Sequence, residues 1–178
     1  QHKTAQSKIG ATSMYFDGSN DYLRISDSGD FAFGSGNFTI DFWIRPAAVS
    51  SLMAVYSQFS FDSGSGNSIL VGIGAEAYVY LKLSNSGTDN GSGYYSDAGS
   101  ITANVWQHVA VVRNGNDLIA FIDGTQVMDT THSGTIHDSN RELWIGKTHN
   151  RSYDMSGYID ELRVSKGIAR WTSDFVVY

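Results

Sequence analysis

Apolar and polar residues alternate along this chain with a period of two, the pattern of β-strands rather than helices. The clearest case is the stretch 37–46, NFTIDFWIRP. Because successive side chains of a strand point to opposite faces, it predicts an antiparallel strand with one buried and one polar face. The apolar face would carry Phe38, Ile40, Phe42 and Ile44, and the polar face Thr39, Asp41, Trp43 and Arg45.

Other stretches predict strands of different exposure. Residues 104–115, NVWQHVAVVRNG, are apolar on both faces, which predicts a central strand with Val105 on one face and His108 on the other. Residues 117–128 predict a hairpin with Asp-Gly at its tip. Only SKGIARW, residues 165–171, has the pattern of a helical turn. Further strands are expected at 13–16, 21–25, 51–59, 69–73, 77–83, 142–146 and 157–164.

These strands predict an all-β fold, a two-sheet antiparallel β-sandwich, because one open sheet would leave a face uncovered. The 19 glycines and single proline agree with short strands joined by tight turns. Three stretches rich in Gly, Ser, Asn and Asp, 60–68, 84–93 and 129–140, are expected to form rim loops. We expect one domain over residues 1–178, with a core from about 13 to 175.

Composition narrows the possible partners. A net charge of −6 with scattered basic residues argues against binding nucleic acid, which requires clustered Lys and Arg. No apolar run is long enough for membrane insertion. The absence of cysteine excludes disulfides and thiolate catalysis. The chain begins with Gln1, so we expect a mature product or a domain of a larger multidomain protein.

Six segments of the chain carry a resemblance to a known family: YFDGSNDYLRI, GNFTIDFWIRP, WQHVAVVRNG, LIAFIDGTQV, LWIGK and GYIDELRVSKGIARW. Together they resemble the laminin-G-like branch of the concanavalin A-like lectin/glucanase superfamily. The resemblance implies a curved jelly roll and an extracellular location or one on a cell or virion surface. In that family such modules occur in bacterial enzymes, adhesins and phage tail proteins, where they bind glycan or protein and often carry calcium.

A calcium site is one expectation from this resemblance. Alternation along the last strand places Asp160 on the same face as Val164, and a buried carboxylate needs backbone N–H donors, an arginine or a cation. The resemblance implies a calcium ion held by Asp17, the carbonyl of Gly36 and Asp160, with Asn20 as a further candidate. A structural Asp160 that only accepts hydrogen bonds remains the alternative.

Catalytic patterns are absent from the sequence. The chain has only three glutamates, none in the Glu-x-Asp-x-x-Glu pattern of related glucanases, and no Gly-x-Ser-x-Gly motif occurs. Asp160 and Glu161 are adjacent, so on a regular strand they would point to opposite faces. The five histidines lack zinc-site spacing, and His108 is expected to be a core residue.

Binding is the remaining class, because ten tyrosines and four tryptophans can stack on sugar rings while polar groups bond the hydroxyls. The tryptophans are expected to pack on the sheets. We therefore predict a non-catalytic carbohydrate-binding module, stabilised or assisted by calcium, whose partner is a glycan or polysaccharide. A protein-interaction or spacer module and, less favoured, a glycoside hydrolase are the alternatives. The ligand-binding candidates are His149, Asn150, Arg151, Tyr153 and Asp154 in one loop, and Asp89, Asn90, Tyr94 and Tyr95 in another.

Overall fold

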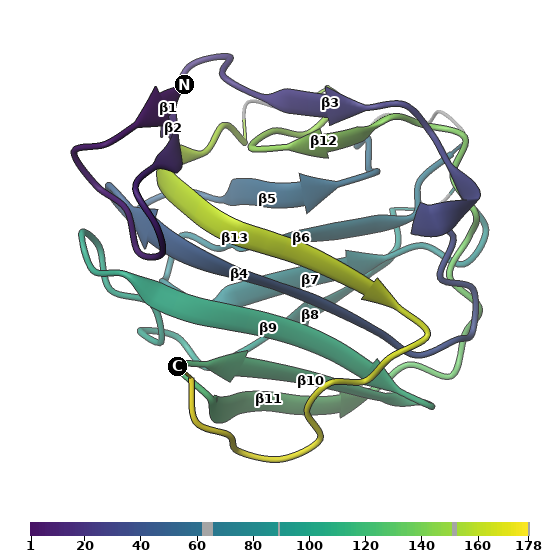
Figure 1. Cartoon of the computed structure of the whole chain (residues 1–178). Helices are drawn as coiled ribbons and strands as arrows, with labels where there is room; N and C mark the ends of the chain where they lie inside the picture. The colour runs from purple at the N-terminus through teal and green to yellow at the C-terminus, as the bar shows by residue number, and fades with distance from the viewer. Residues whose placement is uncertain (62–65, 89, 151–152, 178) are drawn as a thin grey trace.

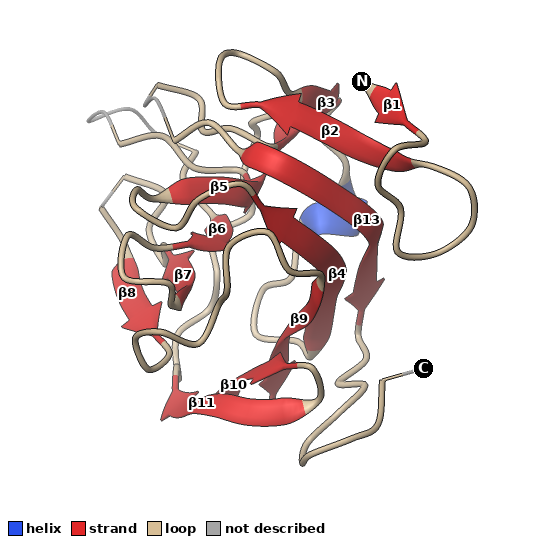
Figure 2. Ribbon diagram, turned by 90° about the vertical axis from the view of Figure 1, so that its left-hand side faces the viewer, coloured by secondary structure: helices blue, strands red, loops and turns tan. Residues whose placement is uncertain are grey.

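Two antiparallel sheets pack face to face in the computed structural model, which describes residues 1–61, 66–88, 90–150 and 153–177 (Figure 1, Figure 2). The predicted all-β sandwich is therefore confirmed. The seven-stranded sheet contains β1 (His2–Lys3), β2 (Ser13–Asp17), β13 (Ser156–Lys166), β4 (Phe38–Pro46), β9 (Gln107–Asn114), β10 (Asp117–Ile122) and β11 (Thr125–Thr131), in that order. The six-stranded sheet contains β3 (Leu23–Ile25), β12 (Leu143–Ile145), β5 (Met53–Ser57), β6 (Ile69–Ile73), β7 (Val79–Leu83) and β8 (Ser92–Tyr95).

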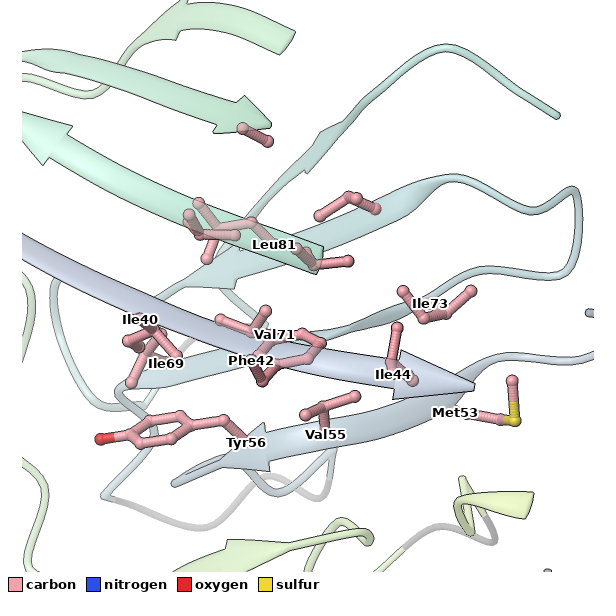
Figure 3. Close-up of a cluster of buried hydrophobic side chains, with 14 of the residues drawn as sticks. Ile40, Phe42, Ile44, Met53, Val55, Tyr56, Ile69, Val71, Ile73 and Leu81 are labelled. Carbon is pink, nitrogen blue, oxygen red and sulfur yellow. The ribbon is translucent and has the colours of Figure 1, made fainter. Parts of the chain in front are cut away.

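The core lies between the two sheets and follows the predicted alternation. Phe42 of β4 is fully buried and lies among side chains from β5, β6 and β7, including Val55, Val71 and Leu81 (Figure 3). All four apolar residues predicted for the inner face of β4 are 0% exposed. Burying these aliphatic and aromatic side chains is the main stabilising contribution to such a sandwich.

A buried arginine fastens the loops at one end of the sandwich. Arg113, at 1% exposure, donates hydrogen bonds to the carbonyls of Gly34, Gly115, His132 and Gly134 at 2.8–3.0 Å. Burial lowers the pKa of its guanidinium from the ordinary value. The four carbonyls come from three segments, since His132 and Gly134 lie in the same stretch after β11, so one side chain holds these segments together.

Three local predictions are wrong. Val105 is 46% exposed and lies outside β9, which begins at Gln107. The stretches 84–93 and 129–140 are not loops throughout, because β8 begins at Ser92 and β11 continues to Thr131. No helical turn forms at 165–171, since β13 runs to Lys166 and Gly167, with φ of 79°, then turns the chain. Among the described residues the helix is a single 3-10 turn, Gly29–Phe31, and none is long and apolar enough to cross a membrane.

A bulge in β13 changes the face on which its residues lie. Asp160 pairs with Trp43, but the next paired residue is Arg163, opposite Asp41, and Glu161 adopts φ of +48°. The bulge places Asp160 on the outer face of the seven-stranded sheet beside Trp43, whereas Val164 pairs with Ile40. The expectation that Asp160 and Val164 share a face is therefore wrong, because it assumed an unbroken strand.

Candidate functional site

Aromatic rings gather on the outer face of the six-stranded sheet. Tyr80 of β7 pairs with Tyr95 of β8, and their rings stack at 5.2 Å between centroids. Tyr78 meets Tyr95 edge-on at 5.3 Å. Tyr95 is 55% exposed, so this group presents a ring to solvent. We call the surface the aromatic face; its residues are Tyr22, Phe61, Tyr78, Tyr80, Tyr95, Trp144 and Tyr153.

The loop that precedes β13 lies on the same surface. Tyr153 meets Phe61 edge-on at 5.2 Å, and its carbonyl accepts a hydrogen bond from the Ala54 amide at 2.9 Å. Burial raises the pKa of the Tyr80 hydroxyl, and the neighbouring hydroxyls of Tyr95 and Tyr153 raise it further. Tyr95 stacks on Tyr80, and Tyr153 packs against the buried cluster that contains Tyr80, so both predicted binding loops contribute to this surface.

A second stack forms at the other end of the aromatic face, on β3 and β12. The rings of Tyr22 and Trp144 lie 4.6 Å apart at 10°, and those of Trp144 and His149 lie 4.4 Å apart at 28°. Tyr22 is 40% exposed. The His149 Nε2 lies 2.9 Å from the carbonyl of Glu142. These contacts hold three rings in a row at the surface.

Lys147 links the predicted binding loop to the first turn. Its ammonium lies 3.0 Å from the Asp154 carboxylate and donates to the side-chain amide oxygen Oδ1 of Asn20 at 2.6 Å. The Lys147 and Asp154 side chains are only 15% and 12% exposed, so solvent screens this pair less than a surface ion pair. The contact fixes Asp154 as part of the scaffold beneath the aromatic face.

The other predicted ligand residues take different positions. The side-chain oxygen Oδ1 of Asn150 accepts a hydrogen bond from the backbone amide of Phe61 at 2.7 Å. Tyr94 points away from the aromatic face and packs against the core, where its hydroxyl lies 2.7 Å from His132 Nδ1. Asn90 is exposed just before β8. Asp89 and Arg151 lie outside the described residues.

Several aromatic residues of this face did not stand out in the sequence. Tyr78 and Tyr80 are two residues apart in the alternation around β7, so they share its outer face. That spacing was a usable signal. The position of Phe61 was not predictable, because it depends on how the connection after β5 folds back onto the sheet. Trp144 packs on a sheet as expected, but it does so on the outer face between two other rings.

The four predicted calcium ligands do not form one site. Asp17 pairs with Ser156 at one end of β13, whereas Gly36 lies just before Phe38, which pairs with Lys166 at the other end. Asp160 accepts backbone hydrogen bonds from Lys8 at 2.9 Å, from Ile9 at 3.0 Å and from Glu161 at 3.0 Å. In the part of the chain that the structure describes, no cluster of three or more His, Cys, Asp or Glu suits a metal. Calcium binding stays a prediction.

The turn between β2 and β3 is held by its own side chains. The Asp17 carboxylate accepts from the Ser19 amide at 2.7 Å, and the Asp21 carboxylate accepts from the Asp17 amide at 3.1 Å. Gly18 and Asn20 adopt φ of 86° and 61°, the left-handed conformation that these residue types tolerate best. These acidic residues therefore bend the chain.

Comparison with known families supports the assignment from the fold. The family model described as the concanavalin A-like lectin/glucanases superfamily matches residues 17–170. The chain belongs to this superfamily. A comparison with curated protein sequences gave no match.

Solved structures with the same fold include binding domains of larger proteins. The binding domain of Paraclostridial Mosquitocidal Protein 1 superposes with a TM-score of 0.73 at 14% identity, over 93% of this chain and 42% of that one. Domain 4 of AbnA, an extracellular GH43 arabinanase from Geobacillus stearothermophilus, in complex with arabinotriose, superposes with a TM-score of 0.67 at 15% identity. The match covers 94% of this chain and 75% of that one. Domains LG4-5 of the mouse laminin alpha1 chain superpose with a TM-score of 0.61 at 18% identity, over 86% of this chain and 41% of that one. This chain thus spans less than half of the first and third of these.

Proposed function

We propose that this chain is a non-catalytic, extracellular carbohydrate-binding module and the recognition domain of a larger multidomain protein. The observation that carries the proposal is the exposed ring of Tyr95, fixed by stacking on Tyr80 at the β7–β8 end of the aromatic face. Two similar structures support it: one is named a binding domain, and the other is in complex with arabinotriose.

The aromatic face would bind a glycan chain by stacking. A pyranose or furanose ring places an apolar C–H face on Tyr95 or Tyr22, while tyrosine hydroxyls exchange hydrogen bonds with sugar hydroxyls. Tyrosine loses little conformational entropy on binding. The ring contacts of Tyr95 and Tyr22 with Tyr80 and Trp144 already order these side chains, which lowers the cost further.

A glycan array, with titration of each glycan that binds, tests the proposal directly. Tyr95→Ala removes the exposed ring, and we expect affinity to fall by about 2- to 10-fold, the equivalent of one stacking contact. Val105→Ala is the matched control, because it truncates an apolar side chain of similar exposure, 46%, away from the aromatic face. Equal affinity of the Tyr95→Ala variant and the wild type would refute the role of this face. A folded protein that binds no glycan would favour the protein-interaction or spacer alternative.

Calcium is proposed as a stabilising ion and needs a separate arm of the same experiment. A module with a dissociation constant of roughly 10⁻⁴ to 10⁻³ M should gain about 1–3 kcal/mol in excess calcium. At this chain length that raises the melting temperature by very roughly 3–10 °C relative to EDTA. Loss of this shift in Asp160→Asn would assign the ion to Asp160. A full shift in that variant would assign it elsewhere, and no shift in the wild type would end the calcium proposal.

A further inference from the structure

The outer face of the seven-stranded sheet carries a pocket of about 570 Å³. Its volume lies within the range of roughly 300–1,000 Å³ that is typical of small-molecule sites. Its walls come from β4, β9 and β13 and from the N- and C-terminal segments, and Figure 2 shows the C-terminal segment on the outer side of this sheet. The polar and aromatic side chains of its lining include Asp41, Trp43, His108, Arg163, Trp171 and Phe175.

An ion pair forms the floor of the pocket. Arg163 donates two hydrogen bonds to the Asp41 carboxylate, at 3.0 Å through Nε and 2.9 Å through Nη2. His108 Nε2 lies 3.5 Å from the same carboxylate, and the Asp41 and His108 side chains are 4% and 6% exposed. Burial acts to raise the pKa of Asp41, but the hydrogen bonds from His108 and Arg163 outweigh it and hold that pKa below its ordinary value.

Hydrogen-bonding groups remain available above this ion pair. In the neutral tautomer that points its Nε2–H at the Asp41 carboxylate, Nδ1 of His108 is a bare acceptor. That buried Nδ1 has no hydrogen-bond partner among the described residues, and such a group is costly unless something fills the site. Arg163 contacts Asp41 through Nε and Nη2, which leaves Nη1 as a donor, and its side chain is 48% exposed. Glu161 also lines the pocket and offers an acceptor.

Aromatic rings form the apolar wall. Trp171 and Phe175 stack at 4.1 Å between centroids and 7° between planes, and both meet His108 edge-on. Trp43 meets His108 edge-on from the neighbouring strand, with centroids 5.4 Å apart. The C-terminal segment is tied to the sheet by the Phe175 amide, which donates to the Gly124 carbonyl at 2.9 Å. The wall is therefore held in place without a ligand.

We propose that this pocket binds the terminal ring of a neutral saccharide. The ring's C–H groups would pack on the aromatic wall, one hydroxyl would donate to His108 Nδ1, and another would accept from Arg163. Hydroxyl groups suit a site with both donors and acceptors, because each can play either role. Among the lining residues the only arginine, Arg163, is already paired with Asp41, and Glu161 adds a further carboxylate, so no excess of positive charge favours an anionic ligand.

This site is separate from the aromatic face and does not require a glycan to bind there. The aromatic face is an exposed surface along which a chain could lie, whereas a pocket accepts a chain end. The four tryptophans allow the two sites to be observed independently. Trp43 and Trp171 line the pocket, Trp144 belongs to the aromatic face, and Trp106 belongs to neither.

The test is ¹⁹F NMR of the full chain labelled with 5-fluorotryptophan, with each resonance assigned by a single Trp→Phe replacement. The probes are the methyl glycosides of glucose, galactose, mannose and xylose, titrated separately. We expect at least one probe to shift the Trp43 and Trp171 resonances saturably while Trp106 stays constant. If no probe moves Trp43 or Trp171, the pocket proposal is wrong, whatever happens at Trp144. A shift of Trp144 alone supports the aromatic face and overturns the pocket.

Two variants test the assigned contacts. His108→Phe keeps a ring but removes the Nδ1 acceptor, and we expect the binding probe to bind about 10-fold more weakly. Should His108→Phe fail to fold, as judged by its Trp144 resonance, Phe175→Leu tests the aromatic wall, and we expect it to weaken binding as well. Lys166→Ala, at the exposed end of β13, is the control. Unchanged affinity in a folded His108→Phe or Phe175→Leu variant contradicts the proposal. Release of reducing sugar from a polysaccharide would also overturn it in favour of catalysis.

Discussion

Replacement of Arg113 tests whether one buried side chain organises the end of the sandwich. Arg113→Met keeps most of the length and apolar character of the side chain but removes the guanidinium. The carbonyls of Gly34, Gly115, His132 and Gly134 then lose their donor. Because Arg113 is 1% exposed, water does not replace those bonds without opening the structure.

The expected loss follows from these four contacts. A buried acceptor left without a partner costs about 1–3 kcal/mol, but the four costs are not additive, because the freed turns can move outward to reach water. We therefore expect a total loss of about 3–5 kcal/mol, which is more than one unsatisfied buried acceptor costs and less than the sum for four. That is a large fraction of a typical total stability of about 5–15 kcal/mol. It corresponds to a fall in melting temperature of very roughly 6–20 °C.

Urea unfolding followed by tryptophan fluorescence is the assay, with the slope and midpoint fitted for each variant. We expect Arg113→Met to lower the midpoint at an unchanged slope, since the exposed area on unfolding stays the same. The midpoint of Arg113→Lys should lie between those of the wild type and Arg113→Met, because lysine keeps the charge but lacks the planar guanidinium that reaches several carbonyls at once. A loss below about 1 kcal/mol in Arg113→Met would refute the reasoning, since it is less than one unsatisfied buried group should cost.

Two further predictions concern buried polar groups. Burial and the nearby Arg113 cation lower the pKa of His132, so the folded state favours the neutral imidazole. The contribution of neutral His132 to the free energy of unfolding is fully present above the unfolded-state pKa of 6.5 and is lost as pH falls through the lower folded-state pKa. His132→Asn should therefore weaken the pH dependence of the free energy of unfolding, measured by urea titration from pH 8 to pH 5. Asp160→Asn should cost about 1–3 kcal/mol locally, because an amide cannot accept all three backbone hydrogen bonds. Faster hydrogen exchange at the Lys8 and Ile9 amides would confirm it, and unchanged exchange would contradict it.

Period-two alternation predicted the fold because the sandwich depends on it. Each strand must bury one face, so Phe38 and Ile40 could be assigned to the core from spacing alone. The pattern failed where the strand itself is irregular. At Glu161 the bulge shifts the register, and no local signal marks a glutamate for the left-handed conformation. Segments that contact the sheet through a few residues, such as β1, were also beyond prediction.

The candidate sites were harder to predict, because they depend on contacts between segments that are distant in sequence. The two predicted loops each place a tyrosine against a cluster that contains Tyr80, which belongs to neither loop. His108 was expected in the core, but it lies on the outer face beside Asp41. The C-terminal segment covers that outer face and forms a second, smaller hydrophobic layer with it. The apolar neighbours of His108 in the sequence therefore could not show whether its side chain lies in the core or under this layer.

The same alternation that builds the core also restricts where a ligand can bind. The inner faces of both sheets are filled by the core, so the outward residues of each strand and the segments that cross them remain for recognition. On β4 these outward residues include Asp41 and Trp43, and on β7 they include Tyr80. The aromatic face and the pocket each combine such outward residues with a segment that crosses the sheet. The crossing segment contributes Tyr153 on the six-stranded sheet and Trp171 on the seven-stranded sheet. Among the residues of these two surfaces, an exposed one such as Tyr95 can therefore vary without disturbing the core between the sheets.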